Sequence, residues 1–441
     1  MLMTLINQSQ RAFEYWSLSS RLVRKKLLED WALELINEED SLSKLIIEEV
    51  GKPITLARAE IQRSVTLIHS TLEAYASFTS EDVALDLLPG GDSARGSLRS
   101  YPLGTVLLIT PFNFPVNLAV HKLAPALAAG NSILWKACPQ APRTSSLLLE
   151  TIRRALSKSG IDTNLVQIIA GGSQETETIA LHQNIKAVSF TGSERVGHHL
   201  KKILWNKKLT LELGGNAGVV IDEDIDVLAV ASQLAISANS YSGQSCCSTQ
   251  RIYIHQKVYE SFTSALVKEV SKLPAGDPYL LETLIGPVID EESAKRIEGW
   301  ISEAVTNGAK RILGGPRVGS FLPPHVLSDV PPTSSICTEE VFGPVLIVQS
   351  VSSFIQGLQQ AQTTRYGLRS SAYTNSIDNL YLAEKMLCAG GVMINLPPTY
   401  RVDSAPFGGV GASGVGMEGP RWALDFFSEK RLIAYAPPPK S

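Results

Sequence analysis

Two adjacent cysteines stand in the segment SANSYSGQSCCSTQR, where Cys246 and Cys247 follow a Gly-Gln pair. The flanking residues are small and polar, which is typical of a loop or of the start of a helix. A thiol becomes a nucleophile where a helix N-terminus or a nearby cation stabilises its thiolate, whereas a buried cysteine is more often an inert small hydrophobe. The local sequence therefore leaves a catalytic and a structural role open.

A glutamate in KKLTLELGGNAGVV is the best candidate for a base. Glu212 ends an apolar strand pattern directly before two glycines, where a carboxylate is costly unless it is paired or functional. The alternative is a strand-end glutamate that faces solvent. A cysteine hydrolase would need a histidine base, but none of the seven histidines lies in a recognisable catalytic setting. His121 lies in an apolar helix pattern, which favours a structural role.

Three further segments place polar groups where strands end. TPFNFPVN holds Asn113 between aromatic residues and beside prolines, so its amide could donate to an oxyanion. FTGSERVG leaves a strand, turns at Ser193 and opens a helix, so its N–H groups could face a phosphate. SILWKACPQAP ends a strand at Lys136, at the edge of a sheet where nucleotides bind. Taken singly, each segment could equally be a connecting turn or a solvated side chain.

The pattern of apolar residues predicts the elements that position these groups. Residues 10–80 show helical periodicity with charged faces. Short apolar runs then predict strands at 105–110, 132–137, 165–170 and 187–192, and a second series at 217–222, 251–256, 311–315, 345–351 and 391–395. Helices are expected between them, for example at 144–160, with Thr144 or Ser145 as its cap, and at 259–273. Strands that alternate with helices predict an α/β fold with two doubly wound parallel sheets.

The composition limits the classes of partner and the cellular compartment that we expect for this protein. The 441 residues carry 40 basic and 43 acidic side chains, a net charge of −3 without runs of one sign, so we expect neither a nucleic-acid nor a membrane surface. The N-terminus does not resemble a signal peptide. Scattered cysteines in odd number indicate free thiols in a reducing compartment, and we expect a cytoplasmic protein. The five are Cys138, Cys246, Cys247, Cys337 and Cys388.

In this order, TPFNFP, the strand end at Lys136, FTGS, ELGG, GQxC, EEVFGPV and PFGG..SG.G.EG resemble the aldehyde dehydrogenase superfamily from about residue 10 to about 432. The resemblance implies a Rossmann-type cofactor domain, a catalytic domain and a small bridging β-hairpin that pairs subunits into a homodimer or homotetramer. The corresponding bounds are 1–83 with 103–213 for the cofactor domain, 214–412 for the catalytic domain, and 84–102 with 428–441 for the bridge.

The resemblance also implies roles for single residues. Cys246 is the expected nucleophile, Asn113 and the Cys246 N–H the oxyanion hole, and Glu212 the base that activates the water releasing a carboxylic acid. Lys122 and Glu418 are expected to support the site and relay protons. No metal is needed, and the cofactor is NAD or NADP. The residues expected to hold it are Thr110, Pro111, Phe112, Lys136, Gly192, Ser193, Gly197, Leu213, Gly214, Glu340 and Phe342.

Two alternatives stay open beside this activity. Acyl transfer to coenzyme A is less favoured because family members with that activity commonly lack the glutamate found here at position 212. An inactive member that acts as a binding protein is expected to have lost one of its central groups, yet Cys246, Glu212 and Asn113 are all present.

The chain departs from the family pattern in ways that bear on ligand choice. Where the family usually has a glutamate that binds the ribose 2′-hydroxyl, this chain has Pro139, which predicts relaxed cofactor specificity or a preference for NADP. Arg401 resembles an arginine of subfamilies that act on short aldehydes, so we expect a short, hydroxylated or anionic aldehyde. The segment before residue 10 is short for the family, which predicts a missing edge of the cofactor domain.

Overall fold

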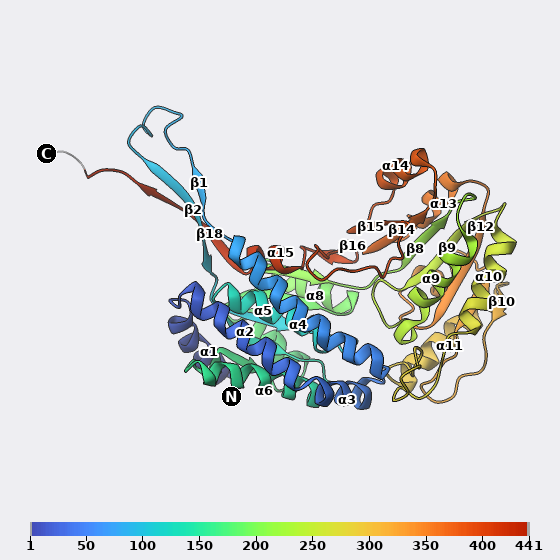
Figure 1. Ribbon diagram of the computed structural model, residues 1–441, viewed down its shortest axis with the longest axis horizontal. Helices are drawn as coiled ribbons and strands as arrows, with labels where there is room; N and C mark the ends of the chain where they lie inside the picture. Colours follow the sequence, from blue (N-terminus) through green and yellow to red (C-terminus); the bar gives the residue numbers. More distant parts are fainter. Residues whose placement is uncertain (1, 439–441) are drawn as a thin grey trace.

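The computed structural model describes residues 2–438, which form two large sheets at opposite ends of the long axis and a smaller sheet that projects from one end (Figure 1). The first large sheet has the strand order β17-β7-β6-β3-β4-β5, and only β17 is antiparallel to its neighbour. Its strands are β3 (Thr105–Ile109), β4 (Ser132–Lys136), β5 (Val166–Ile168), β6 (Ile185–Thr191), β7 (Lys208–Glu212) and β17 (Gly414–Val415).

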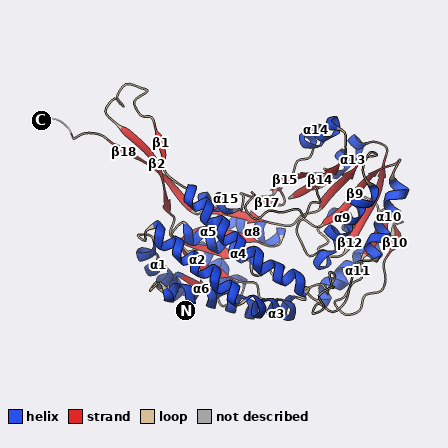
Figure 2. Ribbon diagram, viewed as in Figure 1, coloured by secondary structure: helices blue, strands red, loops and turns tan. Residues whose placement is uncertain are grey.

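Helices cover both faces of this sheet because successive strand residues point to opposite sides (Figure 2). Val106 and Leu108 pack into the core beneath α2, α4, α5 and α6, whereas Leu107 packs with α1, α7 and α8. The helices are α1 (Leu2–Trp16), α2 (Arg21–Asn37), α3 (Glu39–Val50), α4 (Ile54–Ser77), α5 (Asn117–Ala128), α6 (Pro142–Lys158), α7 (Ser173–Leu181) and α8 (Glu194–Ile203), with the short 3-10 turn η1 (Thr163–Leu165).

The expected cap of α6 at Thr144 or Ser145 is wrong, since the helix begins at Pro142. Proline suits the first helical position because its missing N–H has no intrahelical partner there. The next two N–H groups, of Arg143 and Thr144, each donate over 2.8 Å to the carboxylate of Glu49 on α3. A side chain distant in sequence therefore caps the helix, which no local pattern could indicate.

The second sheet has the order β10-β11-β12-β9-β8-β14-β15 and is parallel except at β10. Helices again cover both faces, with Val219 and Val220 facing different cores. Both doubly wound sheets are thus confirmed. The strands are β8 (Ala217–Ile221), β9 (Thr249–His255), β10 (Lys310–Leu313), β11 (His325–Ser328), β12 (Val345–Val351), β14 (Arg369–Tyr373) and β15 (Gly391–Ile394). The helices are α9 (Val227–Asn239), η2 (Ser240–Gly243), α10 (Tyr259–Ser271), α11 (Glu291–Thr306), α12 (Ser335–Thr338), α13 (Phe354–Ala361) and α14 (Ile377–Met386).

The chain returns from the second sheet to the first through a glycine-rich segment. Strand β16 (Val410–Gly411) pairs with β13 (Tyr366–Gly367), and β17 then joins the first sheet beside β7. Helix α15 (Pro420–Phe426) packs against α4 and α5 (Figure 1). This return places residues 401–418 against both halves of the molecule.

The smaller sheet consists of β1 (Glu81–Val83), β2 (Arg95–Pro102) and β18 (Ser428–Tyr435), all antiparallel. Strands β2 and β18 match the expected hairpin, whereas β1 lies wholly before the bound expected at residue 84. The division into domains and the pairing of subunits stay predictions, and residues 439–441 of the expected bridge lie outside the described part of the chain.

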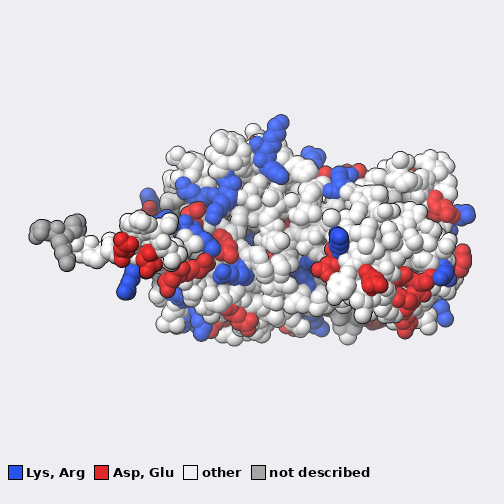
Figure 3. Space-filling view, turned by 90° about the horizontal axis from the view of Figure 1, so that it is seen from above, with Lys and Arg blue, Asp and Glu red and all other residues white. Residues whose placement is uncertain are grey.

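The surface and the helices bear on the expected partners. On the face seen in Figure 3, basic and acidic side chains are interspersed over both halves of the molecule. Within residues 2–438, no helix is long and apolar enough to cross a membrane.

Candidate active site

A cavity of about 700 Å³ runs along the carboxyl ends of the first sheet's strands and is closed by loops of the second half. It collects nearly all the residues that the sequence singles out, although they are spread over most of the chain. Those that line it are Thr110, Pro111, Phe112, Asn113, Lys136, Gly192, Ser193, Glu212, Leu213, Gly214, Cys246, Glu340, Phe342, Arg401 and Glu418.

Two of the expected residues do not line the cavity. Lys122 lies behind Glu418, to which its ammonium is paired. Gly197 lies behind Leu213, because a Cβ at Gly197 would come within 2.3 Å of the Leu213 side chain. Both positions therefore support residues that do face the cavity.

Cys246 lies in a tight turn between η2 and β9, rather than at the start of a helix. Tyr241 and Ser242, which precede this turn, have left-handed backbone angles, with φ of 51° and 56°. Side-chain hydrogen bonds hold this costly conformation: Tyr241 donates to the Val50 carbonyl over 3.1 Å and Ser242 to the Gly286 carbonyl over 2.6 Å. The turn that presents the thiol is therefore rigidly anchored.

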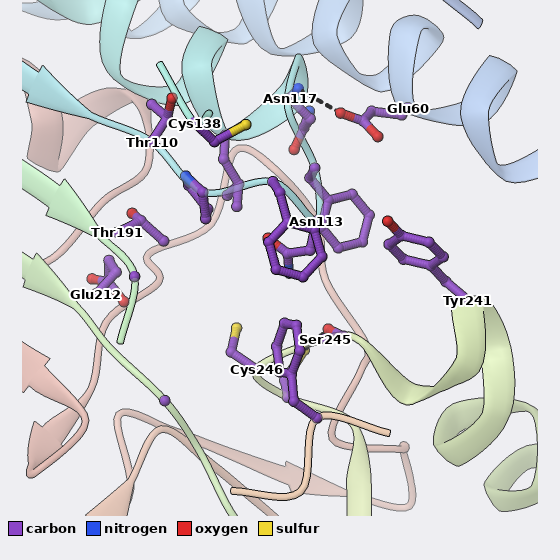
Figure 4. A pocket seen from close by; sticks show the side chains of 18 of the residues that line it. Glu60, Thr110, Asn113, Asn117, Cys138, Thr191, Glu212, Tyr241, Ser245 and Cys246 are labelled. Atoms are coloured by element: carbon purple, nitrogen blue, oxygen red, sulfur yellow. Dashed lines mark hydrogen bonds between the residues drawn. The ribbon is translucent and has the colours of Figure 1, made fainter. Parts of the chain in front are cut away.

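The sulfur of Cys246 points into the cavity on the side of Asn113 and Glu212 (Figure 4). Its neighbour Cys247 is only 7 % exposed, and its sulfur lies 3.3 Å from the Ser245 hydroxyl. The hydrogen bond between the two thiols raises the pKa of Cys246, as burial also does, and lowers the pKa of Cys247 to about 6. Both cysteines line the cavity, but Cys246 is the more exposed of the two, so it stays the predicted nucleophile.

Asn113 follows β3 in a loop that a buried glutamate holds in place. Its amide donates to the Gln244 carbonyl over 3.0 Å, two residues before Cys246. Glu60 on α4 accepts the N–H groups of Val116 and Asn117 at 2.8 and 3.0 Å and pairs with the buried ammonium of Lys52. The amide is thereby fixed beside the reactive turn.

Glu212 ends β7 and is 3 % exposed, and neither of its carboxylate oxygens has a hydrogen-bond partner within residues 2–438. Burial raises its pKa well above the ordinary value, and the nearby carboxylate of Glu418 raises it further. Burial also opposes ionisation of Glu418, but the paired ammonium of Lys122 lowers the pKa of Glu418 below its usual value. The pair therefore consists of an ionised Glu418 and a Glu212 that holds its proton more tightly than an ordinary glutamate.

The other end of the cavity fits a dinucleotide. Ser193 is the N-cap of α8 but makes no side-chain cap bond, and the buried hydroxyl of Thr191 has no partner among the described residues. A Cβ at Gly214 would lie 2.5 Å from the Glu340 carboxylate, which accepts the Gly215 N–H over 3.0 Å. The hydroxyl groups and the N–H groups at the start of α8 suit a pyrophosphate, and the Glu340 carboxylate suits the hydroxyl groups of a ribose.

A charged cluster that the sequence does not reveal borders the cavity at Arg63 and Arg401. Asp403 accepts two hydrogen bonds from Arg63, at 2.9 and 2.8 Å, and lies 3.3 Å from Arg401. His121 contacts both Asp403 and Arg401, but burial, followed by the Arg401 charge, lowers its pKa to about 4, so the ring is neutral. Two guanidinium groups thus face one carboxylate, and one positive charge is left in excess.

The sequence indicates only part of this arrangement. The inward face of α4 carries Ala57, Glu60, Ile61 and Ser64 at helical spacing, so the period places Glu60 among core residues. Arg63 and Asp403 are 340 residues apart, and no local pattern joins them.

The chain matches the aldehyde dehydrogenase family over residues 2–433. It belongs to this family. It is 34% identical over 400 residues to 3-sulfolactaldehyde dehydrogenase of Priestia aryabhattai, covering 90% of this chain and 83% of that one. It is 36% identical over 416 residues to lactaldehyde dehydrogenase of Methanococcus aeolicus, covering 94% and 88%.

Solved structures agree with this assignment. The glyceraldehyde-3-phosphate dehydrogenase of Methanocaldococcus jannaschii, solved with NADP, superposes with a TM-score of 0.94 at 30% identity, covering 99% of this chain and 94% of that one. The protein is therefore an aldehyde dehydrogenase that uses NAD or NADP, as the sequence resemblance implies.

We expect Glu418→Gln to shift the acid limb of the acid-releasing step to lower pH. The carboxylate of Glu418 raises the pKa of Glu212, and a base works only when deprotonated, so removing this charge leaves Glu212 ionised at lower pH. Single-turnover release of acid across the pH range measures the limb, and a melting curve checks that the variant is folded. An unchanged limb would contradict the coupling.

Proposed function

We propose that the protein oxidises a short aldehyde to a carboxylic acid through a thioester on Cys246, which water activated by Glu212 then hydrolyses. The observation that supports this most directly is the convergence of the Cys246 sulfur, the Asn113 amide and the Glu212 carboxylate on one side of a shared cavity (Figure 4). A thiol, an oxyanion donor and a base are the groups that acyl formation and hydrolysis require.

In the first half of the reaction the chain supplies the nucleophile and the oxyanion site. The Cys246 thiolate adds to the aldehyde carbon, and the carbonyl oxygen becomes an alkoxide. The Asn113 amide, which donates to the Gln244 carbonyl in this structure, and the Cys246 N–H are placed to stabilise that charge. NAD or NADP, when bound, accepts the hydride from the same carbon, which leaves a thioester on the sulfur.

In the second half Glu212 takes a proton from water, which attacks the thioester carbon and releases the acid and the Cys246 thiolate. The raised pKa of Glu212 makes it a stronger base than an ordinary glutamate once it is ionised. Glu418, which is ionised and paired with Lys122, then takes part in relaying the proton. Lys122 is itself held by a 2.8 Å hydrogen bond to the Ser189 hydroxyl.

For the cofactor, we assign Lys136 to the adenosine ribose, Gly192 and Ser193 to the pyrophosphate, and Glu340 and Phe342 to the nicotinamide half. Phe342 meets Phe112 edge to face at 5.9 Å across the cavity. Pro139 stands where a ribose-binding carboxylate is usual, so we propose that NADP is accepted at least as well as NAD. A carboxylate at that position would repel the 2′-phosphate of NADP, and proline has none.

For the substrate, we propose a short aldehyde that carries a hydroxyl or an anionic group. Arg401 and Arg63 line the cavity, and their cluster with Asp403 has one positive charge in excess. Relatives named for sulfolactaldehyde, lactaldehyde and glyceraldehyde 3-phosphate act on aldehydes of this kind. Guanidinium groups bind sulfonate, phosphate and carboxylate through paired hydrogen bonds.

Replacing each cysteine in turn tests the proposed nucleophile. Cys246→Ala should abolish NAD(P)H formation, whereas Cys247→Ala should keep at least about a tenth of it, because the Cys246 sulfur points into the cavity and Cys247 is the more buried of the two. Initial rates at 340 nm with a panel of short aldehydes measure both variants. Loss in Cys247→Ala with retention in Cys246→Ala would overturn the assignment, and a requirement for coenzyme A would indicate acyl transfer instead of hydrolysis.

Arg401→Ala should lower kcat/KM for an anionic short aldehyde by about tenfold or more, and that for a neutral aldehyde of equal length far less, because a charge-assisted contact is lost. Arg401→Lys is the matched variant that keeps the charge without the planar fork. Equal losses for the anionic and the neutral aldehyde would rule out direct recognition.

Initial rates with NAD and NADP at equal concentrations test the proposed cofactor preference. Rates with NADP should equal or exceed those with NAD, and a strong preference for NAD would exclude the proposal.

A further inference from the structure

Arg365, in the turn between α13 and β13, bonds to two glutamates that belong to different halves of the molecule. Glu194 is the first residue of α8, which follows a strand of the first sheet. Glu339 follows α12 and precedes β12 of the second sheet. One guanidinium group therefore joins the two halves.

Each of these glutamates is adjacent in sequence to a residue that lines the cofactor end of the cavity. Glu194 follows Ser193, and Glu339 precedes Glu340. Neither Glu194 nor Glu339 lines the cavity itself. The bridge thus lies just outside the cavity and ties together the two turns that border it.

The geometry of the bridge is well suited to a planar fork. The Nε of Arg365 lies 3.1 and 3.2 Å from the two oxygens of Glu194, and Nη2 lies 3.0 Å from one of them. Nη1 donates to Glu339 over 3.0 Å, and Nη2 also contacts that carboxylate. The hydroxyl of Tyr366 lies 2.9 Å from Nη2. Lysine, with a single ammonium, could not engage both carboxylates in this way.

The bridge also settles the charge of the first turn of α8. Burial opposes ionisation of Glu194, but its hydrogen bonds to Arg365 and Tyr366 lower its pKa, so the carboxylate is ionised. An unpaired carboxylate at this helix start would compete with a pyrophosphate for the same N–H groups and repel it. Arg365 neutralises the carboxylate and fixes its position.

We infer that Arg365 is a positioning residue that holds the two borders of the cofactor site together and so sets how tightly and how long the dinucleotide is bound. This inference rests on the proposed placement of the cofactor at Ser193 and Glu340. Arg365 does not contact the cofactor or the substrate. Its side chain is 42 % exposed, so salt should weaken its effect.

The test measures NADPH binding and release directly, without turnover, by nucleotide fluorescence and stopped-flow displacement. Arg365→Ala should raise Kd by about fivefold, mostly through faster release, and the difference from wild type should shrink at high salt. Arg365→Lys should lie between the two. Arg317→Ala is the matched control, because Arg317 also joins two glutamates, Glu291 and Glu298, but within the second half alone.

A second measurement separates the bridge from a general loss of stability. Glu339→Gln should also weaken binding, and the double variant with Arg365→Ala should be no weaker than Arg365→Ala alone, because both changes break the same connection. Equal NADPH release from wild type and Arg365→Ala would overturn the inference, as would additive losses in the double variant. A wild-type protein that bound neither NADPH nor NADH would instead refute the proposed function.

Discussion

The burial of three ionisable groups at one wall of the cavity is the constraint on which the rest of the active site depends. Glu212, Glu418 and Lys122 are almost completely buried, and within this group one ammonium pairs with one of the two carboxylates. Breaking a buried ion pair costs roughly 3–5 kcal/mol, so the fold must hold Lys122 against Glu418 whatever the state of the reaction. The remaining carboxylate then holds its proton unusually tightly, and in the proposed mechanism this makes Glu212 a stronger base than an ordinary glutamate.

The two sheets divide the work of supporting this chemistry. Strand ends of the first sheet carry Glu212 and the Asn113 loop, while the turn that precedes β9 of the second sheet carries Cys246. Such a division demands precise connections between the halves. Several of these are polar: Asn113 to the Gln244 carbonyl, Tyr241 to the Val50 carbonyl, and Arg365 to both Glu194 and Glu339. Because hydrogen bonds are directional, they fix distances that apolar packing would leave adjustable.

The sequence predicted the features that depend on the local periodicity of apolar residues or on the order of motifs. Alternating apolar runs located both parallel sheets. Residue type and position also singled out Cys246, Glu212 and Asn113, but the sequence did not show that they lie close together. Contacts between distant residues escaped prediction. The cap of α6 by Glu49, the pairing of Arg63 with Asp403, and the bridge at Arg365 each join side chains that only the folded chain brings together. Glu60 is an intermediate case. Its helical spacing predicts that it is buried, but not which N–H groups it binds.

The central claim is a thioester on Cys246 that Glu212 must hydrolyse, and trapping it is the most direct measurement. Glu212→Gln, mixed with an aldehyde and NAD(P), should give a burst of NAD(P)H of about one equivalent per site and then almost none. Mass spectrometry of the intact protein and of its peptides should find the added acyl group on Cys246 and none on Cys247. Undiminished steady turnover by Glu212→Gln, or an acyl group on Cys247, would contradict the account.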